Sequence, residues 1–289
     1  MNMKQRYITL PDVWDELTEA DWRELLKMRQ QMIDKRMPLT IDDVRIETAR
    51  MLLKNRGVKT QVNNKQYLVL LSQVADSLSW LWQEQDGGLS LVYRSTINLL
   101  PKVQRGTGKN HQEWLGPLSH GEDLTFGEFR MAAAVVRNYE QHPSVRDLNV
   151  LAGLLYRPEA SEQMKHEQQL RRWPYDWDDF EQKERRGEQM KRWQVWGIYA
   201  WFAYFCEYLT TGIFIIDGQE TCFAPLFKKE ESGGGSQESG GGLSQICLTL
   251  AETHVFGTAR DVDRTPLLTV MQKLLMDYRT LQNLKKKKI

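Results

Sequence analysis

Apolar residues recur every three or four positions along most of this chain, which is the spacing that places side chains on one face of an α-helix. Two such stretches follow Thr18 and Thr40, each with an aspartate three residues further on, a combination typical of a helix N-terminus. A third runs from 65 to 85. The pattern predicts a mainly α fold, a multi-helical body of amphipathic helices with at most one or two short strands.

Two further helices are expected in close succession. Thr125 with Glu128 begins one, and Ser144 with Asp147 begins the next, which Pro158 ends. The short connection "QHP" between them predicts a two-helix hairpin. Before this hairpin the pattern loosens: residues 89–101 favour a short strand, and 104–117 resemble an exposed loop.

The most apolar stretch is "VWGIYAWFAYFCEYLTTGIFII", residues 195–216. It has the length of a membrane span, but Glu207, the break at 210–212 and the scattered Trp and Tyr residues argue against one. We therefore expect a buried aromatic helix at about 190–209, followed by a short strand "GIFIID". This helix is the expected centre of the core, and we expect no membrane partner.

Residues 159–192 are highly charged, and acids and bases nearly balance. The segment is expected to be a solvent-exposed helical arm broken at Pro174. Trp173 and Trp177 lie within it, and exposed aromatics beside arginines are typical of protein contact sites, so both are candidates for partner binding. The alternative, in which they fold back onto the body, stays open.

The expected domain organisation is a helical body over 1–230, a Gly/Ser-rich flexible linker over 231–242 and C-terminal helices over 243–289, with a sub-boundary near 102–120. The residues after the linker are too few for a core of their own, so a C-terminal helical pair is expected to pack on the body or on a partner. In the last helix, spacings of four and three are typical of a helix that lies along another one. Its candidate partner-binding residues are Leu267, Met271, Leu274, Tyr278 and Leu281.

The 39 basic and 38 acidic residues give a formal charge of +1, which provides no overall field that would attract nucleic acid or an anionic membrane. The compact basic cluster is Lys285, Lys286, Lys287 and Lys288. It is interpreted as a solvated helix end, with loose nucleic-acid contact as the alternative. Three cysteines without a CxxC pair and a polar start favour a reducing, cytoplasmic location without a signal peptide.

The chain shows no motif for catalysis, a cofactor or a metal. The loop "RGTGKN" lacks the glycine spacing and the Ser or Thr of a phosphate-binding loop, and His166 has Leu170 where a zinc helix needs a second histidine. No Gly-x-Ser-x-Gly elbow occurs. We therefore expect a protein that is not an enzyme and that needs no cofactor.

Two segments carry a family resemblance. "LTFGEFRMAAAVVRNYE" and "LNVLAGLLYRP" are similar to a pattern in tailed-bacteriophage and prophage proteins, especially tail assembly chaperones and related virion-assembly proteins. The matching residues are Thr125, Gly127, Glu128 and Phe129, then Leu155, Tyr156, Arg157 and Pro158. The resemblance implies a non-enzymatic protein that binds phage structural proteins, such as tail tube or tape measure, in the host cytoplasm. A nucleic-acid-associated phage protein that uses the basic tail is the alternative.

Overall fold

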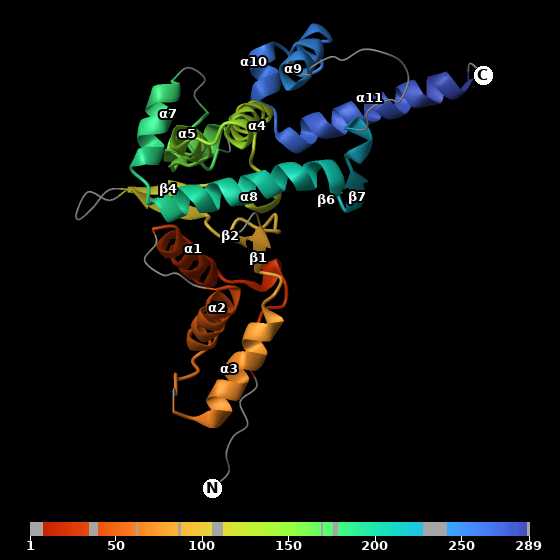
Figure 1. Cartoon of the computed structure of the whole chain (residues 1–289). Coiled ribbons are helices and arrows are strands. Elements are labelled where there is room, and N and C mark those ends of the chain that lie inside the picture. Colours follow the sequence, from red (N-terminus) through yellow and green to blue (C-terminus); the bar gives the residue numbers. More distant parts are fainter. Residues whose placement is uncertain are drawn as a thin grey trace.

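The computed structural model describes residues 8–34, 40–61, 63–85, 88–105, 112–168, 170–175, 179–227 and 242–287. Over these residues the chain is mostly helical, with three small antiparallel sheets between the helices (Figure 1). The prediction of a mainly α fold is confirmed. The prediction of at most one or two strands is wrong, because short hairpins fill the connections between helices.

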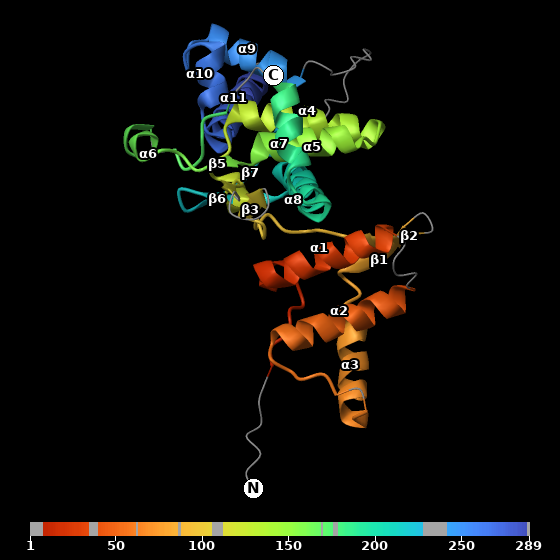
Figure 2. The same ribbon diagram turned by 90° about the vertical axis from the view of Figure 1, so that its left-hand side faces the viewer.

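The N-terminal region is built from η1 (Trp14–Glu16), α1 (Glu19–Ile33), α2 (Ile41–Asn55) and α3 (Lys65–Ser77). The predicted starts of the first two α-helices are confirmed. In α1 the Thr18 side chain accepts from the Asp21 N–H while the Asp21 carboxylate accepts from the Thr18 N–H, and Thr40 forms the same capping box in α2. Figures 1 and 2 show α3 at the end of the molecule that is farthest from α9 and α10.

The helix predicted for residues 65–85 ends early, at Ser77, and residues 82–85 form a strand. This strand, β1 (Trp82–Gln85), pairs antiparallel with β2 (Gly88–Leu91). Trp82 is fully buried, and its indole N–H donates to Thr48 Oγ1 over 3.0 Å. Asp-Gly between two short strands is a hairpin signal, and here it lies at residues 86–87, outside the described part.

The stretch predicted as an exposed loop, 104–117, contains one strand and the end of another. β3 (Lys102–Arg105) pairs with β4 (Gln112–Leu115), and β4 pairs in turn with β5 (Arg157–Pro158). Val103 and Trp114 are partners in the register and are both buried, which explains why this segment folds onto the body. The glycine-rich residues 106–111 lie outside the described ranges.

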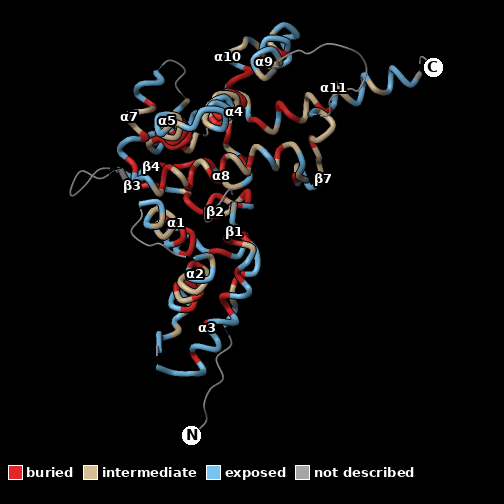
Figure 3. The backbone as a smooth tube through the Cα atoms, in the orientation of Figure 1, coloured by how far each residue is buried: buried red, intermediate tan, exposed pale blue. Residues whose placement is uncertain are grey.

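α8 (Arg192–Thr211) crosses the middle of the molecule and packs against α1, α4 (Phe126–Gln141) and α5 (Val145–Leu155). The predicted aromatic helix is thus present, and β6 (Ile213–Ile216) follows it as predicted. The sequence did not reveal its hairpin partner β7 (Gln219–Cys222), which η4 (Ala224–Leu226) follows after one further residue. Figure 3 shows buried residues along the inner faces of these helices. The largest fully buried aromatic side chains are Trp22, Trp82, Trp114, Trp201, Tyr156, Phe126, Phe202, Phe205 and Phe223.

The charged segment 159–192 is not an exposed arm. It contains α6 (Glu162–Gln168) and α7 (Phe180–Glu188), and α7 packs closely along α5. A Cβ on Gly153 would lie 2.0 Å from the Lys183 carbonyl oxygen, and one on Gly187 would lie 2.1 Å from the Asn149 carbonyl oxygen. The two glycines allow the helix backbones to approach, and this approach buries Lys183 to 2% exposure.

The described part of the C-terminal region forms three helices rather than the expected pair: α9 (Gly242–Glu252), α10 (Ala259–Arg264) and α11 (Leu267–Lys287). α10 and α11 pack on α4, and α9 packs on α10. Thr258 and Asp261 cap the unexpected α10. The Phe126 N–H donates to the Thr265 carbonyl over 2.9 Å, and the Leu267 N–H donates to the Leu124 carbonyl over 2.8 Å. Of the predicted linker 231–242, residues 231–241 lie outside the described part.

Replacement of Gly153 or Gly187 by alanine is expected to lower the free energy of unfolding by about 1–3 kcal/mol, because either new methyl group meets backbone that cannot move without separating α5 from α7. Urea unfolding measures the change. Glu188→Ala, at an exposed position of α7, is the matched control and should change stability little. Unchanged stability in both glycine variants would show that the two helices are not in close contact.

A second prediction concerns acid stability. Burial raises the pKa of Asp21, but hydrogen bonds from Asn55, Arg56 and Thr18 outweigh it, so the pKa is lowered overall. A lowered pKa contributes stability above the unfolded value near pH 4, and this stability is lost as the pH falls through the folded value. Asp21→Asn should therefore cost about 1.5–3 kcal/mol at neutral pH, a difference that shrinks toward about pH 3.

Urea unfolding at several pH values tests this expectation. Glu24→Gln, at an exposed position of α1, serves as the control and should follow the wild-type pH dependence. A deficit for Asp21→Asn that stayed constant between neutral and acid pH would contradict the assigned charge.

Candidate functional site

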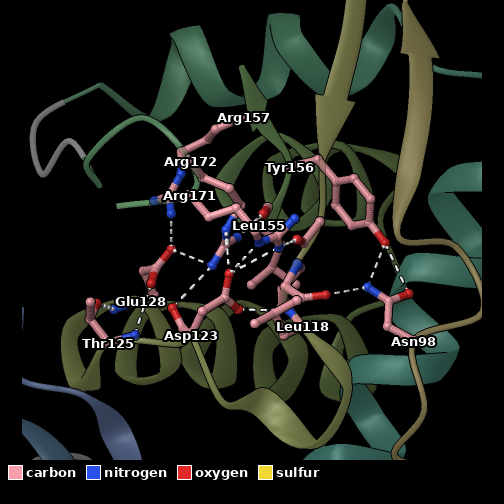
Figure 4. A network of polar contacts seen from close by, with 12 residues as sticks. Asn98, Leu118, Asp123, Thr125, Glu128, Leu155, Tyr156, Arg157, Arg171 and Arg172 are labelled. Atoms are coloured by element: carbon pink, nitrogen blue, oxygen red, sulfur yellow. Dashed lines mark hydrogen bonds and ion pairs between the residues drawn. The ribbon is translucent and has the colours of Figure 1, made fainter. Parts of the chain in front are cut away.

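The most connected polar cluster joins α4, the end of α5 and residues 171–172 (Figure 4). Glu128, only 1% exposed, accepts a hydrogen bond from Arg157 Nη2, and Arg157 is itself 5% exposed. Arg172 Nη2 lies 3.5 Å from the same Glu128 oxygen, and Arg172 Nε donates to Asp123 over 3.2 Å. Two buried arginines therefore share one buried carboxylate.

Further bonds fix the ends of this cluster. Arg171 Nη2 donates to Asp123 over 2.9 Å, and Arg172 Nη1 donates to the Leu155 carbonyl over 2.6 Å. Asp123 also accepts from the Leu118 N–H over 2.6 Å. The loop before α4 is thus held to the segment predicted as a free arm.

Tyr156 extends the cluster toward the β3–β4 sheet. Its hydroxyl donates to the Leu100 carbonyl over 2.6 Å, beside the amide of Asn98, which donates to the Pro117 carbonyl over 2.7 Å (Figure 4). Burial raises the pKa of Tyr156, and burial lowers the pKa of Arg157 to about 10 although Glu128 opposes that shift. These groups keep their charge states at neutral pH.

This cluster is a buried network whose members bond one another. Glu128 and Arg157, which the family resemblance singles out, form a buried ion pair, and Thr125 caps the helix by accepting from the Glu128 N–H over 3.2 Å. Sequence reasoning did not single out Asp123, Arg171 and Arg172. The one local signal was two adjacent arginines before Trp173-Pro174, in a window whose charges balance.

Of the two tryptophan candidates, the structure describes Trp173. Trp173 is 47% exposed, directly after the buried Arg172. Trp177 lies outside the described residues. Trp173 therefore stands at the edge of a segment that is fixed to the body.

The candidates on α11 divide into two groups. Leu267 and Met271 are buried against the body, Leu274 and Tyr278 are half-buried, and Leu281 is 59% exposed. Lys285 and Lys286 are exposed, whereas the side chain of Lys287 and the whole of Lys288 lie outside the described part. The first half of the helix thus packs on the body of its own chain.

The second half of α11, residues 276–287, is here called the distal part. It extends beyond the other helices (Figure 1), and most of its residues are exposed (Figure 3). Tyr278, Leu281 and Leu284 continue the apolar stripe of the buried half, since spacings of three and four keep side chains on one side of a helix. Leu284 is 53% exposed. The stripe therefore runs off the body without a covering surface among the described residues.

A groove of about 760 Å³ lies between α4 and α8, and we name it the α4–α8 groove. The small side chains Ala133, Ala200 and Ala203 line it, together with Phe129 and Val136. Glu140 and Glu207 also line it, and Arg137 is the one basic residue among the described lining residues. The groove is thus mainly apolar with an acidic excess.

The titratable groups of the groove reflect this environment. Burial raises the pKa of Tyr199 to about 12, and the Glu140 carboxylate adds to the shift. Burial and Glu140 likewise raise the pKa of Cys206, which is a thiol at neutral pH. Burial raises the pKa of Tyr204; Glu207, Tyr208 and Asp15 add to the shift, and Arg94 opposes it. A buried neutral thiol is not an activated nucleophile.

In the described ranges no group of three or more His, Cys, Asp or Glu side chains could hold a metal ion. Within those ranges no helix is both long and apolar enough to cross a membrane. The loop "RGTGKN" contributes nothing to either finding, because residues 106–110 are not described. The chain matches no protein-family model, no curated protein and no solved structure.

Glu128→Gln is expected to lower the free energy of unfolding by about 3–5 kcal/mol, because it leaves two buried arginines without their shared carboxylate. Arg157→Met should cost less, since Glu128 then keeps Arg172 and the Thr125 N–H. Urea unfolding of both variants, with Thr125→Ala as a cap-only control, tests this order. A larger loss in Arg157→Met would refute the shared role of Glu128.

Proposed function

We propose that this protein is a non-enzymatic assembly factor of a tailed bacteriophage or prophage, such as a tail assembly chaperone, that binds other phage structural proteins in the host cytoplasm. The observation that carries the proposal is the distal part of α11, whose apolar stripe leaves the body and stays exposed at Leu281 and Leu284. The family resemblance supplies the phage context.

An exposed apolar stripe on a helix is a common means of recognition between proteins. An amphipathic helix places apolar anchors at spacings of three and four into a groove of its partner. In the distal part these anchors are Tyr278, Leu281 and Leu284, and Arg279, Lys285 and Lys286 add positive charge. The partner surface is therefore expected to be apolar with acidic residues around it.

The residues of the resemblance support this proposal as a scaffold. Thr125, Glu128, Tyr156 and Arg157 build the buried cluster, and α4, which Thr125 begins, carries the C-terminal helices. On this proposal, proteins that share the sequence pattern also share the buried cluster that fixes these helices. The binding residues are then free to differ between proteins that share the pattern.

Recovery of phage proteins from phage-producing cells tests the function. The tagged wild type is expected to retain tail tube or tape-measure protein, and Leu281→Asp is expected to lose it, because a charge at the centre of the stripe cannot be buried in an apolar groove. Leu248→Asp, an equally exposed leucine of α9, is the matched control and should retain the partner. The proposal would be contradicted if no tail protein were recovered and normal tails formed in the absence of this protein.

The alternative is a nucleic-acid-associated phage protein, favoured by the exposed Arg279, Lys285 and Lys286 at the end of α11. Binding of this kind depends on phosphate contacts, so it weakens steeply with salt and disappears in a Lys285→Glu, Lys286→Glu variant. Leu281→Asp should leave it largely intact. The two variants therefore separate protein binding from nucleic-acid binding.

A further inference from the structure

The distal part of α11 and the α4–α8 groove have matching properties. The groove is lined by three alanines beside larger apolar and aromatic side chains such as Phe129, Val136 and Trp196, and its volume suits several apolar groups. The distal part offers Tyr278, Leu281 and Leu284 on one side of a helix. An exposed apolar stripe on a helix thus exists in the same chain as a mainly apolar groove.

Their charges are also complementary. The groove lining carries Glu140 and Glu207 against Arg137. Next to the lining, Asp15 and Arg94 act on Tyr204 with opposite signs. The distal part carries one acid, Asp277, which lies 2.5 Å from Lys273, and several bases. Two distal parts placed side by side would bring like charges together, whereas a distal part in the groove pairs bases with acids.

One copy cannot fill its own groove. The first half of α11 is fixed on α4 and η4, and the Leu267 N–H is bonded to the Leu124 carbonyl. From this anchor the rigid helix extends beyond the other helices (Figure 1), and none of the described residues that line the groove belongs to α11. The distal part can therefore enter only the groove of another molecule.

We infer that the α4–α8 groove binds the distal part of α11 from a second copy of this chain, so that copies associate head to tail. The inference deepens the proposed function, since it rests on the distal part being a protein-binding helix. The two surfaces differ, so the contact is heterologous, and each contact leaves one free groove and one free helix. Association therefore continues to rings or chains.

Two defective variants test this geometry directly. Leu281→Asp damages the helix and keeps the groove, whereas Ala203→Trp fills the groove and keeps the helix. Sedimentation velocity should show concentration-dependent association of the wild type and a monomer for each variant alone. A mixture of the two variants should form a one-to-one heterodimer that grows no further, because one intact groove and one intact helix remain.

Controls separate this result from misfolding. Thermal melting establishes that each variant folds, and Glu207→Lys provides a groove variant at an exposed position that leaves packing unchanged. It should weaken association by about tenfold, and Leu248→Asp should leave association unchanged. A wild type that stays monomeric throughout, or a mixture that forms no heterodimer, overturns the inference.

Failure of the head-to-tail inference can be distinguished from failure of the proposed function. Glu207→Lys keeps its α11 unchanged, so it should still retain tail proteins from phage-producing cells. A wild type that binds tail proteins but never self-associates overturns the head-to-tail inference alone. Self-association without recovery of tail proteins overturns the proposed function and supports the contact between copies.

Discussion

The buried ion pair between Glu128 and Arg157 is the interaction on which the arrangement of the helices depends. Burying a carboxylate and a guanidinium costs several kcal/mol each, so such a pair persists only where further bonds satisfy it. Here the Glu128 carboxylate also accepts from the Thr125 N–H and lies beside Arg172. One side chain thus connects the start of α4, the strand after α5 and the segment before α7.

The same region sets the direction of α11. Main-chain hydrogen bonds join Phe126 to Thr265 and Leu267 to Leu124, on both sides of the capping residue of α4. Arg130, one turn further along α4, pairs with Asp263 at 3.0 Å. The start of α11 is therefore fixed to the start of α4, and because a helix is stiff, the course of its distal part follows from contacts made around residue 125.

Local signals in the sequence were sufficient for the helix starts and insufficient for the charged segment. Thr18, Thr40 and Thr125 were identified as caps because a capping box involves residues only three positions apart. Arg172 was assigned to an exposed arm because its partner Asp123 is 49 residues earlier in the chain. The spacing of charged residues within one segment does not show that they pair in the core with charges from a distant segment.

For the candidate surfaces, too, local patterns were visible in the sequence, whereas contacts between distant segments were not. The apolar stripe of α11 was visible from its spacing, but the sequence does not show where along the helix contact with the body ends. Buried Leu267 and exposed Leu281 were therefore equally strong candidates for partner binding. The groove was invisible, because Ala133 and Ala203 become neighbours only when α4 and α8 pack. Small residues inside an aromatic helix were the available signal.

In the proposed assembly, one helix surface serves two kinds of partner. A distal part that fills the groove of a second copy cannot bind a phage structural protein at the same time, so the two associations compete. A contact formed by about three turns of one helix is small beside typical stable interfaces, and association between copies should accordingly be weak and reversible. An apolar stripe covered in this way is protected from nonspecific aggregation, yet it is released when a partner with a deeper or more acidic groove is present.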